Sequence, residues 1–419
     1  MSTLGLVLAG GKGSQLSVLT EQRAKPALPV GGSYCLIDFA LSNLANSQIE
    51  SIAVLAQFQT QTLSEHIGDG QVWSKAGIPL WMAGVERTGL PAYRGTADAV
   101  FQNRKFIAAS GCDRVLIVAG DHLYRQDYRD MIRFHTEKGA AFTLSYIEVE
   151  PAQREKFGMV RVDANQKIVM FDEKPAVTDA VIGSMGIYVF NTTYLLDLLE
   201  TTIGADPGAV DFGQHIIPRI VAAGQAYAFP HSGGWADVGQ VQDYWQTNLA
   251  LLEKRPPFPL DDPAWPLLAP AEARAPARVR MEGHAADCLL SAGCVVEGEV
   301  VSSVLAPGVV VERGAVVRRS VILRDAVIRA GAQVEDCVLD ERSEVGVNAK
   351  VGGGDDQTPN QAQPQLLFAG ISLIGADARI PAGAVIGPNC LIAPGARPEN
   401  FEGLELASGM TVNRFNSVE

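Results

Sequence analysis

Short apolar runs alternate with amphipathic stretches over the first 250 residues of the chain. The apolar runs predict buried strands at residues 4–8, 49–57, 113–121, 140–149, 158–164 and 185–191. Stretches with helical character lie between them, among them residues 95–110 and 127–139. This alternation predicts an α/β domain with a Rossmann-like, mostly parallel sheet and helices on both faces. Ligands of such a domain bind at the carboxyl ends of the strands.

The alternation stops at a proline-rich stretch, residues 254–276, which predicts a linker. We place the domain boundaries at 1–253 for the α/β domain, 254–283 for the linker and 284–419 for a second domain.

Aliphatic residues recur every six positions in the second domain. One series is Val304, Val310, Val316, Ile322, Ile328 and Val334, and another is Ile374, Ile380, Ile386 and Ile392. A hexapeptide period places one short strand in each repeat and stacks the aliphatic side chain inward on its predecessor, which predicts a parallel β-helix. Residues 352–368 break the period and predict an exposed loop.

Composition narrows the class of protein. The 419 residues are 47% hydrophobic, carry a net charge of −13 and include six cysteines without a CxxC pair. The negative charge argues against a general binder of nucleic acid or membrane surfaces, and the cysteine spacing gives no zinc or redox motif. No signal peptide or membrane-spanning run is recognised, so we expect a cytoplasmic protein.

Glycines follow the first apolar run directly, at Gly10, Gly11 and Gly13. Glycines after a buried strand allow the backbone to approach an anion such as a phosphate, although a plain tight turn would also explain them. The spacing fits neither the dinucleotide fingerprint nor the Walker loop. Lys25 lies twelve residues after Gly13 and next to Pro26.

Carboxylates end two other segments. Asp121 follows an apolar strand and Asp237 lies in GGWADVGQ. Two such carboxylates can share one Mg²⁺, or each can cap a turn. Lys174, placed before Pro175, is a candidate phosphate ligand or a solvated lysine. The YRGTADA stretch at residues 93–99 precedes a helix, whose start can bind an anion or base edge or be capped by the protein.

In order, the chain carries LAGGKGSQL, RAKPALPVGG, YRGTADAVFQN, GDHLYRQDY, FGMVRVD, FDEKP, SMGIYVF, DFGQHIIP, WADVG and a hexapeptide β-helix. This set closely resembles the ADP-glucose pyrophosphorylases (glucose-1-phosphate adenylyltransferases) over essentially the whole chain. The resemblance implies a nucleotidyltransferase domain followed by a left-handed β-helix, and the synthesis of ADP-glucose and pyrophosphate from ATP and glucose 1-phosphate for glycogen. It also implies Mg²⁺ as cofactor and a homotetramer or a hetero-oligomer with a paralogous subunit.

The resemblance assigns roles to individual residues. It implies catalytic roles for Lys25, Asp121 and Asp237, with both aspartates holding Mg²⁺. It implies nucleotide contacts at Leu8, Ala9, Gly10, Gly11, Gly13, Gln15, Gln57, Gly95 and Thr96. It implies glucose 1-phosphate contacts at Tyr93, Gly158, Glu173, Lys174 and Ser184.

The sequence departs from the family where the family carries positive charge. Three positions that hold arginine in the family hold other residues here: Gln15 in the motif GGxGxRL, Ala236 in WRDVG and Cys35 after GGKY. Gln22 stands in place of a basic residue and Ala92 in place of an aromatic one, whereas Arg23 is present as in the family. Loss of one charged contact to a transition state costs on the order of 3 kcal/mol. These departures leave a second hypothesis, a weakly active or inactive regulatory subunit.

A hexapeptide acyltransferase is the alternative from another class. Such an enzyme uses a histidine base on its β-helix, and His284 is the one histidine after residue 250. That hypothesis leaves the N-terminal half of the chain without a role.

Overall fold

The structure is a computed structural model, and it describes residues 2–49, 51–74, 77–82 and 92–414. The chain forms two compact units that each draw on separated segments. The first unit comprises residues 1–11, 37–235 and 263–269, and the second comprises residues 12–36, 236–262 and 270–419. The boundaries expected after residues 253 and 283 stay a prediction.

The first unit is built on one sheet in the order β10-β9-β11-β6-β1-β4-β5, with β8 and β12 joined through β11. Strand β1 is parallel to β4 and β6, and β11 runs antiparallel to β6. The strands of this sheet are β1 (Thr3–Ala9), β4 (Ser51–Ala56), β5 (Leu80–Met82), β6 (Arg114–Ala119), β8 (Phe142–Glu148), β9 (Gly158–Val162), β10 (Ile168–Glu173), β11 (Ile182–Asn191) and β12 (Ala226–Pro230), and the short strand β7 (His122–Tyr124) lies outside it.

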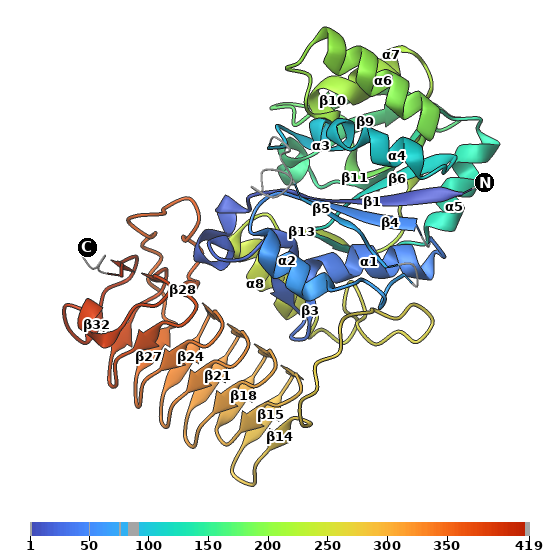
Figure 1. The fold of residues 1–419 in the computed structure, drawn as a ribbon. Helices are drawn as coiled ribbons and strands as arrows, with labels where there is room; N and C mark the ends of the chain where they lie inside the picture. Colours follow the sequence, from blue (N-terminus) through green and yellow to red (C-terminus); the bar gives the residue numbers. More distant parts are fainter. Residues whose placement is uncertain (1, 50, 75–76, 83–91, 415–419) are drawn as a thin grey trace. The chain divides into compact units, whose positions relative to one another are not determined.

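Helices cover both faces of this sheet, with α1 and α2 on one side and α3 and α4 on the other (Figure 1). The α/β architecture with a mostly parallel sheet is therefore confirmed. The helices are α1 (Leu36–Asn46), α2 (Thr60–Ile67), α3 (Thr96–Gln102), α4 (Arg104–Ala109), α5 (Tyr128–Glu137), α6 (Thr192–Ala205) and α7 (Ile217–Ala222), with short turns η3 (Pro151–Lys156) and η4 (Phe212–Ile216).

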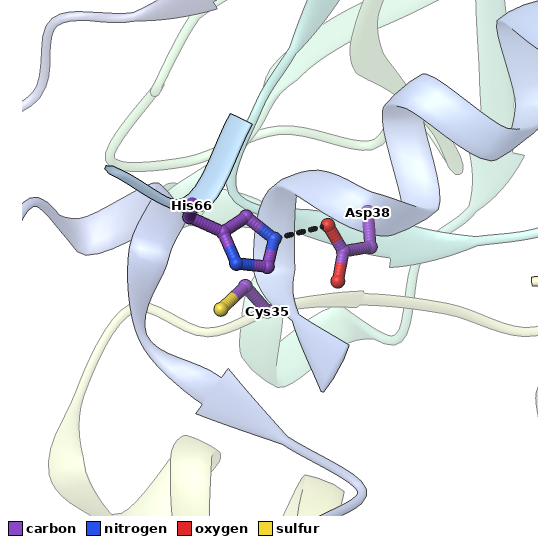
Figure 2. Close-up of side chains that lie close together, drawn as sticks. All are labelled: Cys35, Asp38 and His66. Carbon is purple, nitrogen blue, oxygen red and sulfur yellow. Dashed lines mark hydrogen bonds and ion pairs between the residues drawn. The ribbon is translucent and has the colours of Figure 1, made fainter. Parts of the chain in front are cut away.

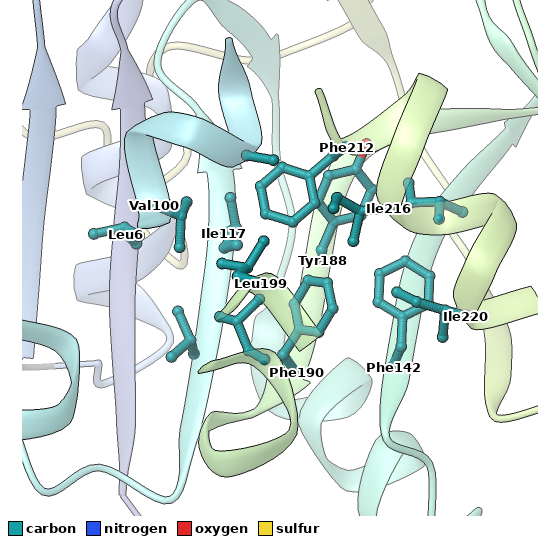
Figure 3. Close-up of a cluster of buried hydrophobic side chains, with 14 of the residues drawn as sticks. Leu6, Val100, Ile117, Phe142, Tyr188, Phe190, Leu199, Phe212, Ile216 and Ile220 are labelled. Carbon is teal, nitrogen blue, oxygen red and sulfur yellow. The ribbon is translucent and has the colours of Figure 1, made fainter. Parts of the chain in front are cut away.

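The core of the first unit lies between the sheet and the α3–α4–α6 layer (Figure 3). Aromatic rings form its centre: the centroids of Phe142 and Phe190 are 4.7 Å apart, and those of Phe190 and Phe212 are 5.8 Å apart. Such tilted pairs add to the stabilisation that comes from burying apolar area. This packing fixes the strands whose carboxyl ends carry the candidate site residues.

Part of the proline-rich linker is anchored to the first unit. The Trp265 indole donates a hydrogen bond to the Asn43 side chain, 2.9 Å away, and Ser42 exchanges hydrogen bonds with the backbone of Leu268. Both partners lie on α1, so residues 263–269 are fixed along this helix instead of forming a free spacer.

The second unit combines an early segment of the chain with the β-helix. Its early part holds η1 (Ser14–Thr20), η2 (Lys25–Ala27), β2 (Pro29–Val30) and β3 (Tyr34–Cys35). Helix α8 (Val241–Ala250) follows β13 (Trp235–Asp237), and its start is closed by a capping box between Gln240 and Asp243.

The C-terminal part is a parallel β-helix whose coils stack in sequence order (Figure 1), and the predicted left-handed β-helix is confirmed. Three parallel sheets form its walls. One contains β14 (Arg278–Val279), β17 (Val295–Val296), β20 (Val310–Val311), β23 (Val327–Ile328), β26 (Glu344–Val345) and β29 (Arg379–Ile380). The second contains β15 (His284–Ala286), β18 (Glu299–Val301), β21 (Val316–Arg318), β24 (Gln333–Glu335), β27 (Lys350–Gly352), β30 (Val385–Ile386) and β32 (Glu405–Leu406). The third contains β16 (Leu289–Leu290), β19 (Val304–Leu305), β22 (Val321–Ile322), β25 (Cys337–Leu339), β28 (Ser372–Ile374), β31 (Leu391–Ile392) and β33 (Thr411–Val412), and the turn η5 (Pro398–Asn400) lies near the end.

The strict period of six is wrong in part of the β-helix. The central coils pair residues 17 positions apart, as in Val310 with Val327 and Val316 with Gln333. The inward positions therefore shift by one residue in each coil. Val310 and Val316, expected inside, are half-buried, and their neighbours Val311 and Val317 fill the interior.

The loop expected at residues 352–368 lies between β27 and β28. Most of its residues are exposed, as predicted, but Asn360 and Leu367 are buried. The loop is thus held to the protein at two of its side chains.

Candidate functional site

The glycine stretch begins where β1 ends. A Cβ atom built on Gly10 would lie 3.7 Å from Gln57 and 3.8 Å from the Tyr93 ring, so the three residues are in contact. The backbone N–H of Tyr93 donates to the Gln57 side chain, and the Tyr93 hydroxyl accepts from Asn103 at 2.9 Å. The structure therefore brings Gly10, Gln57 and Tyr93 together.

The neighbouring positions differ in what surrounds them. Leu8 and Ala9 complete β1, and their roles in nucleotide binding stay a prediction. Among the described residues, no atom lies within 4 Å of a Cβ built on Gly11. Contacts within the protein do not require glycine at this exposed position. The close approach of a ligand such as a phosphate to the backbone would require it.

Asp121 lies one residue beyond a tight contact between two strands. The backbone N–H of Gly120 donates to the Leu8 carbonyl at 2.9 Å, and a Cβ at Gly120 would come within 3.1 Å of Val7. Glycine is needed there for the end of β6 to lie against the end of β1. The Asp121 carboxylate, with 23% of the side chain exposed, lies 3.8 Å from His122 Nε2. Asp121 therefore follows the same edge of the sheet as Gly10.

The start of α3 is capped by the protein. The backbone N–H groups of Ala97 and Asp98 donate to the Val210 carbonyl at 2.9 and 3.1 Å. The Thr96 hydroxyl donates to Asp211 at 3.0 Å, and a Cβ on Gly95 would clash with Val210. Of the two sequence hypotheses for YRGTADA, this geometry favours the cap, and nucleotide contacts at Gly95 and Thr96 stay predictions.

Glu173 is packed between two glycines. A Cβ on Gly158 would lie 2.8 Å from the Glu173 carboxylate, and one on Gly213 would overlap it. Burial raises the pKa of Glu173, the neighbouring Lys174 partly offsets this, and Asp211 adds to it. A carboxylate that the protein keeps partly dehydrated is suited to accept hydrogen bonds from a ligand.

Lys174 adopts an unusual backbone conformation beside it. Its φ of 48° is left-handed, which Pro175 does not require, because proline only excludes the right-handed helix for the residue before it. The Lys174 N–H donates to the Phe157 carbonyl at 3.0 Å, and Nζ lies 3.9 Å from Glu173 on a side chain that is 62% exposed. Strained backbone of this kind is concentrated at functional sites.

Ser184 lies on β11 at a bulge in its pairing with β8. Its hydroxyl accepts a hydrogen bond from the Gly186 N–H at 3.3 Å. The hydroxyl is half-buried, and its expected contact with the sugar stays a prediction.

The second unit holds Gly13 and Lys25 together. Gly13 is left-handed, with φ 68°, and a Cβ there would lie 3.0 Å from the Lys25 Cβ and 3.1 Å from Thr20. The Gly13 carbonyl accepts from Leu16 N–H and from the Thr20 hydroxyl at 2.8 Å. Glycine is required here for both its conformation and its contact with Lys25.

Lys25 is 9% exposed, and its Nζ lies 3.4 Å from Oδ1 of Asp237. The structure thereby brings together two residues expected to be catalytic. Gln15 is exposed, and its Oε1 lies 3.5 Å from Nε2 of Gln240, at the limit of a hydrogen bond. Gln240, which follows the ADVG motif, was not expected from the sequence.

Arg23 has a partner that sequence reasoning missed. Its guanidinium lies 2.9 Å from Asp340 and 3.3 Å from Glu341, both in the β-helix. Burial alone would lower the pKa of Arg23, but the two carboxylates outweigh it and raise that pKa. The positive charge of Arg23 is therefore already paired with carboxylates of the protein itself.

A further buried hydrogen bond between titratable side chains lies on the α1–α2 side of the first unit (Figure 2). His66 Nε2 lies 2.6 Å from Oδ1 of Asp38, whose side chain is fully buried. No motif in the sequence links these residues, because they lie on successive helices of ordinary composition.

Comparisons with known proteins match an N-terminal and a C-terminal part of the chain to different families. The model of a family described as nucleotidyl transferase matches residues 4–254, and one described as the GlmU-like C-terminal hexapeptide matches residues 270–374. No helix within the described residues is both long and apolar enough to cross a membrane.

Curated relatives match over nearly the full length. A glucose-1-phosphate adenylyltransferase of Thermomicrobium roseum is 42% identical over 99% of this chain and 98% of its own. Those of Acetivibrio thermocellus and Thermotoga neapolitana are 36% and 38% identical, covering 99% and 97% of this chain and 99% and 98% of their own.

Proposed function

Because this chain belongs to the glucose-1-phosphate adenylyltransferase family, we propose that it forms ADP-glucose and pyrophosphate from ATP and glucose 1-phosphate. A phosphate oxygen of the sugar attacks the α-phosphorus of ATP in line. The new oxygen–phosphorus bond forms as the bond to the β-phosphate bridge breaks, and pyrophosphate leaves. Such chemistry depends on positioning and on neutralising charge more than on covalent catalysis.

The observation that carries the proposal is the buried Lys25 beside Asp237. A lysine with little exposure, placed against the glycine stretch, is a point charge ready for a triphosphate. Asp237 holds its ammonium in place while no phosphate is bound. We propose that Gly10, Gly11 and Gly13 supply backbone approach to the phosphates, with Gln15 as a neutral donor.

For glucose 1-phosphate, we propose the cluster of residues at the end of β10. Lys174 binds the phosphate of glucose 1-phosphate, and Glu173 accepts hydrogen bonds from the sugar. Support comes from the left-handed backbone of Lys174 and from the close packing of Gly158 on Glu173. Ser184 and Tyr93 are the further proposed contacts.

Mg²⁺ is the proposed cofactor. The side chains of Asp121 and Asp237 are 23% and 47% exposed, and each offers the oxygen ligands that Mg²⁺ prefers. When bound, the ion neutralises the negative charge that develops on the phosphates. We further propose a cytoplasmic enzyme of glycogen synthesis that assembles as a tetramer.

The test is pyrophosphate release by the purified chain with ATP, Mg²⁺ and glucose 1-phosphate. A Lys25→Ala variant, purified identically, controls for enzymes of the expression host. We expect turnover that requires both substrates and is lost in the variant. ATP binding without turnover would instead favour the regulatory-subunit hypothesis.

A further inference from the structure

The turn that follows the glycine stretch contains a strained residue. Ser17, within η1, has φ 52° and ψ −135°, a conformation that residues other than glycine rarely adopt. The residue is also buried, with 8% exposure. Within the turn, the Thr20 hydroxyl donates a long hydrogen bond of 3.4 Å to the Ser17 carbonyl. A shorter contact from elsewhere in the unit must add to it if Ser17 is to keep a conformation that the local backbone disfavours.

The holding contact comes from the β-helix loop. The Ser17 hydroxyl donates a hydrogen bond of 2.6 Å to Oε1 of Gln363, which lies 346 positions later in the chain. Both residues belong to the second unit. Gln363 lies in the loop between β27 and β28, the stretch that interrupts the hexapeptide period.

The loop is rigid enough to support Ser17 because Asn360 anchors it. Asn360 is fully buried, and its amide donates to the carbonyls of Asn389 and Met410 at 3.0 and 3.2 Å. Its side-chain carbonyl accepts from the backbone N–H groups of Ala362 and Gln363 at 3.0 and 2.9 Å. Gln363 is thus connected through Asn360 to the last coils of the β-helix.

The same turn, η1, is also hydrogen-bonded to the glycine stretch. Gly13 accepts two hydrogen bonds from η1, from Leu16 and Thr20, and these residues flank Ser17 on either side. Gly13 also contacts Lys25. A relaxation of Ser17 toward an ordinary conformation would therefore displace the Gly13 backbone and the lysine packed against it.

We propose that Gln363 is a positioning residue for ATP, acting through Ser17 on Gly13 and Lys25. The inference rests on the proposed function, since it assumes that the glycine stretch binds the triphosphate. Gln363 does not touch the nucleotide in this account. The loop that breaks the β-helix period thereby stabilises the turn next to the glycine stretch.

The experiment compares five variants of the full-length chain: Gln363→Ala, Ser17→Ala, the double variant that combines these two changes, Gln363→Glu and Gln365→Ala. Gln363→Glu keeps an acceptor oxygen for Ser17, and Gln365→Ala changes an exposed glutamine two positions away in the same loop. The readouts are the ATP Kd by calorimetry, and the KM values for ATP and glucose 1-phosphate. Loss of one buried hydrogen bond corresponds to about a fivefold change in an equilibrium constant.

We expect Gln363→Ala to raise the Kd and KM for ATP by roughly three- to tenfold, with less than a twofold change in the KM for glucose 1-phosphate. Ser17→Ala should do the same, and the double variant should be no worse than either single one, since both remove one interaction. Gln363→Glu should restore most of the affinity, and Gln365→Ala should behave as wild type.

A lower melting temperature for Gln363→Ala with an unchanged ATP Kd would overturn the proposal, because the contact would then be structural only. An equal rise for both substrates, or additive losses in the double variant, would also overturn it. If the wild type binds ATP without turnover, the proposed function fails while the Kd values still decide the role of Gln363. Absence of ATP binding by the wild type would overturn both.

Discussion

Lys25 and Asp237 are separated by 212 positions in the chain, yet Nζ of the lysine lies 3.4 Å from Oδ1 of the aspartate. The lysine is buried against Gly13, whereas nearly half of the aspartate side chain is exposed. The carboxylate therefore has one side on the lysine and one side open to solvent. It can orient the lysine and still present oxygen to a ligand.

The first prediction concerns this pair. Asp237→Asn keeps the shape of the side chain but removes the charge that orients Lys25 and that would hold Mg²⁺. We expect kcat to fall by about a hundredfold or more, with a melting temperature close to that of the wild type. The rate of pyrophosphate release at saturating substrate concentrations gives kcat, and thermal unfolding gives the melting temperature. The control is Asp261→Asn, which changes an exposed aspartate of the same unit. Wild-type turnover in Asp237→Asn would remove this residue from the mechanism.

Lys174→Ala tests the assignment of the two substrates. The change removes one cation at the proposed sugar-phosphate position, so the KM for glucose 1-phosphate should rise by about ten- to a hundredfold. The KM for ATP should change by less than about threefold. Initial rates with each substrate varied in turn give both values. Lys156→Ala, at an exposed lysine nearby, is the matched control. A larger effect on ATP would reverse the assignment.

Glu173 gives a prediction about pH. Burial raises the pKa of Glu173, so the folded protein binds this proton more readily than the unfolded chain does. The ionised carboxylate therefore costs stability at pH 7, and the cost disappears as the pH falls through the folded-state pKa. Glu173→Gln should raise the melting temperature at pH 7, and the gain should shrink at lower pH.

The same variant should bind the sugar less well. We expect Glu173→Gln to raise the KM for glucose 1-phosphate, because an amide is a weaker acceptor than a carboxylate. Differential scanning calorimetry at pH 7 and pH 5 and initial-rate kinetics are the two measurements. Glu155→Gln, at an exposed glutamate, should change neither. A gain in stability that grows on acidification would contradict the assignment of the pKa shift.

Gln15→Arg separates an enzyme from a regulatory subunit. Gln15 is exposed, and the family resemblance implies at this position an arginine that would neutralise the triphosphate. If the absence of this positive charge limits turnover, kcat of Gln15→Arg should exceed that of the wild type by roughly ten- to a thousandfold. Gln15→Lys tests whether charge alone is sufficient, since lysine lacks the forked donors of arginine.

Two results would contradict the view that Gln15 limits activity. Full wild-type turnover with no gain in Gln15→Arg would show that another group neutralises the triphosphate. Arg23 is a poor candidate, because Asp340 and Glu341 already bind it. No turnover in either protein, with ATP binding retained, would indicate a regulatory subunit.

Local patterns in the sequence were enough to predict the α/β unit and the β-helix. Strand alternation and glycine placement are set by neighbouring residues, so the stretch from β1 to Gly13 could be read directly. The register of the β-helix could not, because its coils of 17 residues make the repeat slip by one position. A fixed step of six consequently selected Val310 instead of Val311.

Local sequence patterns could not predict the contacts between segments that are distant in the chain. Ser17 with Gln363 and Arg23 with Asp340 join residues more than 300 positions apart, and each partner has an ordinary sequence context. The left-handed φ of Lys174 was also unforeseen, because proline restricts the preceding residue without selecting this conformation. The sequence predicted candidate site residues, whereas the contacts that hold several of them in place could be found only in the structure.

The pairing of Arg23 with Asp340 has a consequence for how the protein is made. Asp340 follows Arg23 by 317 residues, and ribosomes add about 5 to 20 residues each second, so Arg23 waits roughly 15 to 60 s for its partner. Throughout that time the nascent chain lacks the partners of Arg23 and of Ser17, because Asp340 and Gln363 have not yet been translated. Premature termination before the β-helix would leave the N-terminal segment permanently in this state, open to chaperones and proteases. The native contacts of Ser17 and Arg23 therefore form only after the β-helix has been translated and folded.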